Sequence, residues 1–313
     1  MNQSEEKELV RVSSMYYEEG MTQAEIARNM GVSRSLISKM LIDAKEAGVV
    51  EIFINSKSSY SIRLERELEL QYDLKRVLVV DTLDLEASEV KKMAAREAAL
   101  WLQKMIKGSK KLGISWGESL RELVNRYPFE KQSDVTIFPL IGGMGDKYID
   151  IHSNQLCYDL ARKLRAKTRY LYAPALISNT SLRKELANNP TIYNVMEESK
   201  SVDIALVGIS DPRNNSTMEK IGYINQKDIE KLKENEVVGD INSRFFGEDG
   251  READVNINQQ VMGISLEEIK QIPTVMAIAY ENSKFDAVEV AVKHKLFNVL
   301  VTTDEIAKRL LEK

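Results

Sequence analysis

From about residue 75 onward, short apolar and β-branched runs alternate with helical patterns, and this alternation constrains the fold more than any other sequence feature. The runs lack a clean polar–apolar alternation, as expected of parallel strands that are buried on both faces. We predict a doubly wound, mostly parallel α/β sheet, in which ligands bind at the carboxyl ends of the strands. The predicted strands are Val77–Val80, Leu112–Ser115, Val135–Leu140, Tyr170–Ala173, Ile204–Val207, Thr274–Ala279 and Val299–Val301, with helices over 87–106, 154–164 and 286–294.

The N-terminal part of the chain has a different pattern, with three short helical stretches followed by a strand-like run. A chain of 313 residues is long for one core, which also favours a division into domains. We predict a small domain over residues 1–55, a serine-rich linker and charged connecting helix over 56–74, and a large domain over 75–313. Within the connecting part, Ile62–Leu70 reads as an amphipathic helix.

Composition excludes several classes of protein. No apolar run approaches 18 residues, and the polar, acidic start of the chain does not resemble a signal peptide, so we expect a cytoplasmic protein. One cysteine and two histidines offer no recognisable zinc site, and we expect neither a metal nor a cofactor. The single cysteine, Cys157, is predicted to be a buried helix residue. Because the net charge is −4, any DNA binding must depend on a local basic patch.

The N-terminal domain carries the signals of a helix-turn-helix. Thr22 and Glu25 have the spacing of a reciprocal capping box, and Ser33 is placed to cap a third helix that extends to about Ala47. Ala27 allows close helix packing, and Gly31, four residues later, suits a tight turn. The strand-like run Val49–Ile54 would then form the wing of a winged helix-turn-helix. The predicted helices cover residues 9–19, 23–29 and 34–47.

The third helix has two distinct faces. Its apolar face carries Ile37, Met40, Leu41 and Ala44. The opposite face is mostly polar and lies in a segment, residues 28–45, with a net charge of +3, which suits the major groove of DNA. A small helical domain with a solvated third helix is the alternative. The predicted DNA-binding residues are Gln23, Arg34, Ser35, Ser38 and Lys39.

At this point the sequence resembles a known family. The segment TQAEIARNMGVSRSLISKMLIDAKEAGVVEI resembles the helix-turn-helix of SorC/DeoR-type sugar-sensing regulators, and the resemblance continues through GISWGESL, PLIGGMGD, VVGDINSRFF and VLVTTDEIAKRLL. It implies a winged helix-turn-helix joined to an effector domain related to sugar-phosphate isomerases, acting as a dimer or tetramer. It also implies a phosphorylated sugar as effector and, by the habit of the family, repression that the ligand relieves.

The loop that follows the second predicted strand is the first candidate for the effector site. A helix that starts directly after a strand exposes backbone N–H groups and the positive end of its dipole, which favours an anion. Ser115 and Ser119 add hydroxyl groups, and Gly117 allows a close approach of the backbone. An ordinary turn with a serine cap is the alternative, and the resemblance to the family's phosphate loop favours binding. Glu118 is an awkward neighbour for phosphate, and we expect its side chain to point away or to reach sugar hydroxyls.

Two further loops and one helix start contribute candidates. The glycines of Ile141–Asp146 suit a backbone that touches a ligand, although a plain turn explains them equally well. Asn154 and Asp240 resemble family positions that face the sugar, and their alternative role is local capping. The residues expected here are Gly142, Gly143, Gly145, Asn154 and Asp240.

Lys284 resembles the family lysine that pairs with the phosphate, a task for which a point charge is suited. A solvated surface lysine is the alternative. Relatives often carry Gly-Gly just upstream of this lysine, where this chain has Tyr280 and Glu281. Those bulky residues would narrow the site, so the effector can differ from the common ones.

An enzyme is the main alternative function, because the large domain resembles sugar-phosphate isomerases. Asp240 and His152 are candidate bases, but no Asp/His pair has convincing spacing, and the helix-turn-helix would be unexplained. We therefore expect no catalytic residues. A purely architectural DNA-binding protein would leave the large domain without a role. Because one helix-turn-helix reads one half-site, we expect a homodimer or homotetramer on operator DNA, with Ile62, Leu64 and Leu68 as a candidate contact between subunits.

Overall fold

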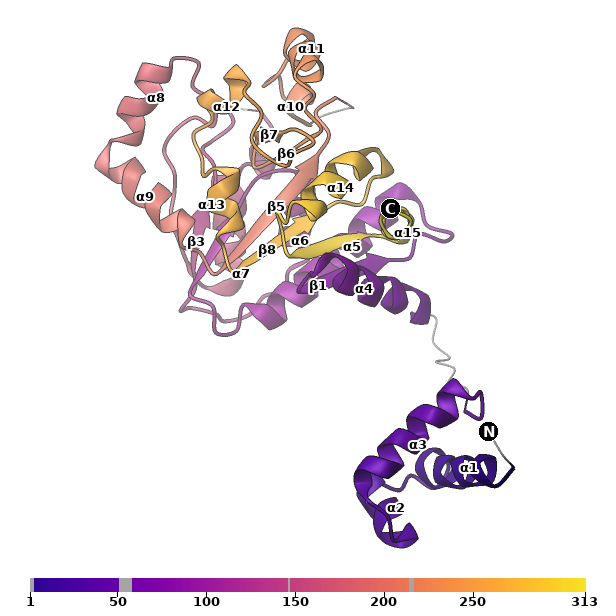
Figure 1. Cartoon of the computed structure of the whole chain (residues 1–313). Helices are drawn as coiled ribbons and strands as arrows, with labels where there is room; N and C mark the ends of the chain where they lie inside the picture. The colour runs from indigo at the N-terminus through magenta and orange to yellow at the C-terminus, as the bar shows by residue number, and fades with distance from the viewer. Residues whose placement is uncertain (1–2, 51–57, 146, 214–216) are drawn as a thin grey trace. The chain divides into compact units, whose positions relative to one another are not determined.

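A computed structural model describes residues 3–50, 58–145, 147–213 and 217–313 of the chain. It divides into two compact units, Met1–Ser59 and Tyr60–Lys313, each of which is described here by itself (Figure 1). Within the described residues, no helix has the length and apolar character required to span a membrane.

The first unit is a bundle of short helices with the capping predicted from the sequence. Thr22 and Glu25 form the reciprocal capping box, with Thr22 N–H donating to Glu25 Oε2 at 2.8 Å. Gly31 ends the second helix with φ of 70°, in the left-handed region that glycine adopts without strain. Most of the predicted wing, residues 51–54, lies outside the described residues. The helices are α1 (Gln3–Tyr17), α2 (Gln23–Met30) and α3 (Arg34–Glu46).

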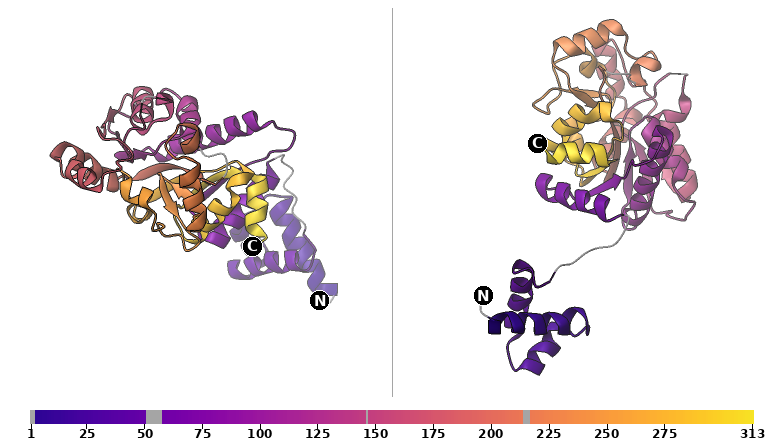
Figure 2. Two further views of the ribbon diagram at one scale, coloured as in Figure 1. Left: turned by 90° about the horizontal axis from the view of Figure 1, so that it is seen from above. Right: turned by 90° about the vertical axis from the view of Figure 1, so that its right-hand side faces the viewer.

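A parallel sheet forms the centre of the second unit (Figure 2). Its strand order is β1-β9-β8-β5-β2-β3-β4, and every neighbouring pair in this order is parallel. The predicted mostly parallel α/β fold is therefore confirmed. The strands are β1 (Arg76–Val80), β2 (Lys111–Ile114), β3 (Thr136–Pro139), β4 (Lys167–Thr168), β5 (Ile204–Ser210), β8 (Thr274–Ile278) and β9 (Val299–Thr303).

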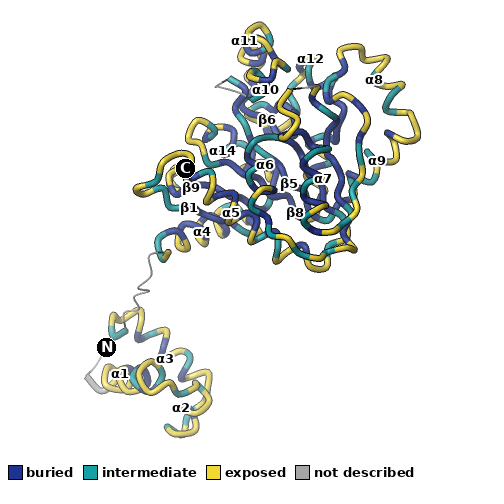
Figure 3. Tube along the Cα trace, turned by 180° about the vertical axis from the view of Figure 1, so that it is seen from behind, coloured by how far each residue is buried: buried dark blue, intermediate teal, exposed yellow. Residues whose placement is uncertain are grey.

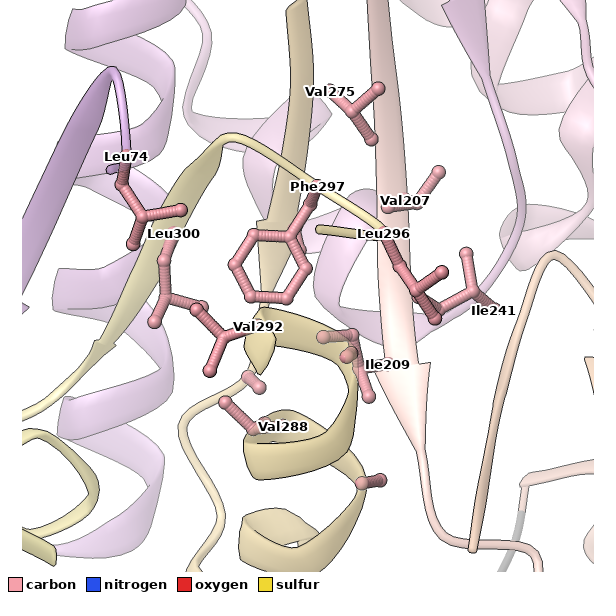
Figure 4. Packing of buried hydrophobic residues seen from close by; sticks show 14 of the residues in the cluster. Leu74, Val207, Ile209, Ile241, Val275, Val288, Val292, Leu296, Phe297 and Leu300 are labelled. Atoms are coloured by element: carbon pink, nitrogen blue, oxygen red, sulfur yellow. The ribbon is translucent and has the colours of Figure 1, made fainter. Parts of the chain in front are cut away.

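Helices cover both faces of this sheet, as continuous apolar strands require. One face packs against α5 (Ala87–Met105), α6 (Glu118–Arg126) and α7 (Ser153–Leu164). The other packs against α4 (Ser59–Tyr72), α13 (Leu266–Lys270), α14 (Phe285–Lys293) and α15 (Asp304–Leu311). Figure 3 shows the buried strands between more exposed helices, and Figure 4 shows Val288 and Val292 of α14 in the second core.

Further elements gather at one end of the sheet, as both views show (Figures 1 and 2). The antiparallel hairpin of β6 (Gly239–Ile241) and β7 (Arg244–Phe246) pairs with the last residues of β5. The sequence analysis did not predict this hairpin. The remaining elements are helical. They are α8 (Thr180–Ala187), α9 (Pro190–Lys200), α10 (Thr217–Lys220), α11 (Gln226–Glu234), α12 (Asn256–Gln260), and the short 3-10 helices η1 (Ile149–Ile151) and η2 (Asn282–Lys284).

The strand predicted over Tyr170–Ala173 is wrong. Strand β4 consists of Lys167 and Thr168 alone, and the chain then leaves the sheet. Tyr170 and Tyr172 stack on each other at 5.8 Å between ring centroids, and Tyr172 is 74% exposed. Leu171 and Ala173 are buried in a small cluster outside the sheet, so this segment packs against other loops and α9 instead of extending β4.

The connecting helix α4 also differs from its predicted role. Of the three residues expected at a contact between subunits, Leu64 and Leu68 are instead buried in the core of their own unit, whereas Ile62 is 51% exposed. Glu65 and Glu69 accept hydrogen bonds from the N–H groups of Val79 and Val77 at 3.0 and 3.1 Å. The helix therefore covers the free edge of β1 and satisfies N–H groups that a further strand would otherwise pair.

Candidate functional site

The candidate effector site lies at the ends of β2 and β5, from which the sheet extends in opposite directions. Strands β2, β5 and β8 are adjacent and parallel, so their carboxyl ends meet at one edge of the sheet. From β2 the sheet continues through β3 and β4, whereas from β5 it continues through β8 and β9 in the opposite direction. Loops diverge at such a switch point and leave a crevice. Here the crevice is a cavity of about 200 Å³.

The loop between β2 and α6 forms one wall of the cavity. Gly117 precedes α6 with φ of 120° and ψ of 168°, a conformation that is open essentially to glycine alone. The Ser115 hydroxyl donates to Asn242 Oδ1 at 2.7 Å, and Trp116 Nε1 donates to Ser243 Oγ at 2.9 Å. The first turn of α6, which includes Ser119, thereby faces the cavity. Its backbone N–H groups give this wall a positive potential.

The hairpin tip of Asn242 and Ser243 holds the neighbouring loops together. Both residues have positive φ, 57° and 59°, as a tight two-residue hairpin turn requires. The Asn242 side-chain amide also donates to the carbonyl oxygens of Leu140 and Ile264, at 3.2 and 3.3 Å. One buried amide thus joins the loop after β2, the end of β3 and the segment before α13. The backbone strain of these positive φ angles is offset by the hydrogen bonds that the two side chains make.

Asp240, on strand β6, is the buried carboxyl group of the cavity. The Ser210 hydroxyl donates a hydrogen bond to Asp240 Oδ1. Burial raises the pKa of Asp240 to about 6, although the Ser210 hydroxyl, the backbone of Ser243 and Lys284 oppose the shift. The group is therefore mainly protonated, and a proton donor, below about pH 6, and mainly ionised, and an acceptor, above it.

Lys284 supplies a cation from the loop between β8 and α14. Its Nζ lies 3.0 Å from Glu281 Oε2 and 5.5 Å from the centroid of the Tyr280 ring. The Ser119 hydroxyl lies 3.3 Å from the Tyr280 hydroxyl, which connects this loop to the start of α6. Lys284 is therefore placed beside the positive wall of the cavity rather than in free solvent.

The acidic residues around the cavity have basic partners. Glu118 pairs with Lys91 of α5 at 2.9 Å, and this contact lowers the pKa of Glu118 despite its partial burial. Asp211 pairs with Arg213 at 2.8 Å. Lys220 of α10 lies at the rim. These pairs reduce the repulsion that an anionic ligand would meet.

The structure separates the residues that the sequence analysis assigned to the effector. The cavity contains six of them, Ser115, Gly117, Glu118, Ser119, Asp240 and Lys284. Gly142, Gly143, Gly145 and Asn154 do not line it. The expected bare backbone is not present at Gly142 and Gly143, because their N–H groups donate to Met262 and Ala173. A Cβ at Gly142 would lie 2.4 Å from the Ala173 carbonyl oxygen, so close packing of two chain segments explains this glycine.

A second cavity, of about 340 Å³, contains Gly143 and Asn154. The Asn154 side chain is engaged by the backbone of Leu171: its Nδ2 donates to the carbonyl oxygen, and its Oδ1 accepts from the N–H group. His152 also lines this cavity, and its buried Nε2 has no hydrogen-bond partner among the described residues. Asp240 and His152 line different cavities, so the two candidate bases of the enzyme alternative are not brought together.

The sequence analysis missed several residues of the site, among them Asn242, Ser210 and Lys220. A signal existed for Asn242, because Asn-Ser between two β-rich runs is a hairpin-turn pattern. No local signal marked Ser210 or Lys220, because their roles depend on strands that are distant in sequence.

The candidate DNA-contacting surface lies on helix α3. Arg34, Ser35 and Lys39 are exposed, while Ile37 and Met40 on the opposite side are buried. The apolar residues Leu36 and Ile42 are exposed at 43% and 54%, and an exposed apolar side chain beside basic residues suits contact with thymine methyl groups. The sequence analysis had not singled out Leu36.

Comparison with known proteins agrees with this geometry. Residues 56–312 match the family described as putative sugar-binding domain, and residues 9–46 match region 4 of sigma-70, a helix-turn-helix. The chain belongs to the SorC/DeoR family of sugar-binding transcriptional regulators. Among SorC/DeoR relatives, the sorbitol operon regulator of Klebsiella pneumoniae is 30% identical over 306 residues, which cover 97% of each chain.

Solved structures of the SorC/DeoR family share the fold. The full-length sorbitol operon regulator SorC of Klebsiella pneumoniae has a TM-score of 0.78 at 30% identity, covering 99% of this chain and 100% of that chain. A DeoR family transcriptional regulator of Listeria monocytogenes is 48% identical, with a TM-score of 0.76 over 80% of this chain and 98% of that chain. These relatives are transcriptional regulators and not enzymes.

The raised pKa of Asp240 predicts a pH-dependent stability. In the unfolded chain the pKa is near 3.8, so the folded protein binds more protons between pH 3.8 and about 6. The stability contributed by protonated Asp240 is full below pH 3.8 and is lost as the pH rises through about 6. Asp240→Asn, which cannot ionise, should therefore raise the free energy of unfolding by at most about 3 kcal/mol at pH 7.5 and by about half as much at pH 5, and Tm should rise accordingly.

Thermal unfolding of both proteins at the two pH values checks this prediction. Asp254→Asn, at an exposed position, serves as the control and should change Tm little at either pH. An equal change for Asp240→Asn at pH 5 and pH 7.5 would contradict it.

Proposed function

We propose that this SorC/DeoR regulator is a repressor of a carbohydrate-utilisation operon, acts in the cytoplasm, and releases operator DNA when a phosphorylated sugar binds. The observation that carries the proposal is the cavity at the ends of β2, β5 and β8. It combines a lysine, a helix start and a buried carboxyl group. A ligand with an anionic end and a hydroxylated end matches that arrangement.

The anionic end of the ligand binds, in this proposal, between Lys284 and the first turn of α6. The ammonium group supplies a full charge, the Ser119 hydroxyl supplies a hydrogen bond, and the helix start supplies backbone N–H groups. The Gly117 conformation, which brings the backbone close to the cavity, supports this placement. A neutral sugar would use none of the charge at this end.

The hydroxylated end of the ligand binds at Asp240. A sugar hydroxyl can donate to the ionised carboxylate or accept from the protonated acid, and the partners of Asp240 fix its orientation. The phosphate therefore anchors the ligand, and Asp240 selects among sugars by the positions of their hydroxyl groups.

Operator DNA binds, in this proposal, to the exposed face of α3. Arg34 and Lys39 contact guanine or phosphate, with Ser35, Ser38 and Gln23 beside them. A single such helix covers one half-site, so the protein acts as a dimer or tetramer on a near-palindromic operator.

Replacing Arg34 or Lys39 with Ala should weaken operator binding without loss of the fold, because both side chains lie outside the core. Base contacts of this kind contribute about 1–3 kcal/mol each. Binding to operator DNA at fixed salt measures the effect. Arg11→Ala removes the same charge from an exposed position on α1 and is the matched control. If neither α3 variant binds more weakly than that control, the placement is wrong.

The protein should be at least a dimer in solution. Because Leu64 and Leu68 are buried within one subunit, their substitution should lower the stability of the subunit before it affects assembly. Light scattering at micromolar concentration, with and without operator DNA, measures the mass. A monomer under both conditions would refute the proposed assembly.

Replacing Lys284 with Ala should weaken binding of a phosphorylated effector about ten- to a hundredfold, because a charge-assisted hydrogen bond is lost. Calorimetry against a panel of sugar phosphates and their unphosphorylated parents measures this loss. Lys270→Ala is the control, because Lys270 also pairs with a glutamate three residues away but lies outside the cavity.

Two results would refute the phosphosugar assignment. One is a neutral sugar that binds the unaltered protein as tightly as its phosphate. The other is normal phosphate-ligand binding by Lys284→Ala.

A further inference from the structure

The charge of Lys284 is compensated by a carboxylate of its own loop. Glu281, three residues earlier in the same loop, places Oε2 at 3.0 Å from the lysine Nζ. The two partners differ in exposure, since the side chain of Lys284 is 16% exposed and that of Glu281 is 51% exposed. The lysine is therefore fixed inside the cavity, whereas the carboxylate lies at its mouth.

Tyr280 keeps the lysine in this position. The ring lies under the ammonium group at 5.5 Å, and the Tyr280 hydroxyl is tied to Ser119 at 3.3 Å. Burial raises the pKa of the Tyr280 hydroxyl, which stays protonated and neutral. When Glu281 turns away, Lys284 thus retains the cation–π contact and remains directed at the start of α6.

We infer that Glu281 is a specificity-determining residue, an internal carboxylate that competes with the effector for Lys284. This inference rests on the proposed function of the cavity. A ligand engages Lys284 only by replacing the carboxylate, so its anion must attract the lysine more strongly than Glu281 does. A phosphate dianion meets that condition through its second charge and its three acceptor oxygens. A ligand with one carboxylate gains nothing in the exchange, and a neutral sugar cannot make it.

The size of the effect follows from the exposure of the pair. A partly exposed ion pair of this kind corresponds to about a 1.4- to fivefold change in an equilibrium constant. Glu281 therefore does not close the site. It lowers the affinity of every anion that uses Lys284 by about this factor.

Glu281→Gln tests the inference because it removes the charge and nearly preserves the shape. The probes are inorganic phosphate and acetate, titrated into the full chain at constant ionic strength and followed by the shift in Tm that a bound ligand causes. The variant should bind phosphate about 1.4- to fivefold more tightly than the unaltered protein. It should also show a response to acetate, so that the preference for phosphate becomes smaller.

Two further variants separate competition from a general change in charge. Glu267→Gln removes a similar carboxylate that pairs with Lys270 outside the cavity, and it should leave both titrations unchanged. In the double variant with Glu281→Gln and Lys284→Met, the gain in phosphate affinity should disappear, because no lysine is released.

The outcomes distinguish this inference from the proposed function. If Lys284→Ala loses phosphate but Glu281→Gln binds it as the unaltered protein does, the competition is refuted and the phosphate site stands. A gain that persists in the double variant also refutes competition. If the unaltered protein responds to neither phosphate nor any sugar phosphate, the proposed function fails, and the inference fails with it.

Discussion

The parallel pairing of β2 with β5 is the constraint on which the site depends. These strands are far apart in sequence, yet their hydrogen bonds align Leu112 with Ile204 and bring both carboxyl ends to one edge. The loop after β2, the hairpin that pairs with β5 and the loop after β8 therefore meet at this edge. Asn242 joins three of the resulting segments through one buried side chain. A cavity with polar groups from separate loops is the consequence.

The distribution of charge explains how a cavity rich in carboxylates can accept an anion. Glu118, Asp211 and Glu281 each form an ion pair with a basic side chain, which reduces the repulsion between their negative charges and an anion. Asp240 differs, because its burial disfavours ionisation and raises its pKa to about 6. In the proposed function this carboxyl group is retained, although burial disfavours its ionised form, because it accepts a hydrogen bond from the ligand. That is the usual relation between stability and function at binding sites.

Particular elements show where sequence reasoning succeeded and where it failed. The capping box of Thr22 and Glu25 and the two faces of α3 were predicted correctly, because they depend on residues three or four positions apart. Strand runs such as 77–80 and 299–301 were also predicted, since a buried parallel strand is apolar throughout. Tyr170–Ala173 was also predicted as a strand, but its two buried residues pack in a cluster outside the sheet. Leu64 and Leu68 were expected at a contact between subunits, but the tertiary structure buries them in the core of the sheet domain.

The sequence by itself determined the alternation of strands and helices in a mostly parallel α/β fold, the helix-turn-helix and several of the loops that line the candidate site. Each of these follows from periodicity, capping or glycine within a short stretch of chain. Only the tertiary structure decided which of those groups meet. It placed Ser210 against Asp240, Tyr280 against Ser119, and Gly142 against the Ala173 carbonyl rather than against a ligand. These contacts join residues 30 to 161 positions apart, and no local pattern encodes a distance in space between segments so far apart along the chain.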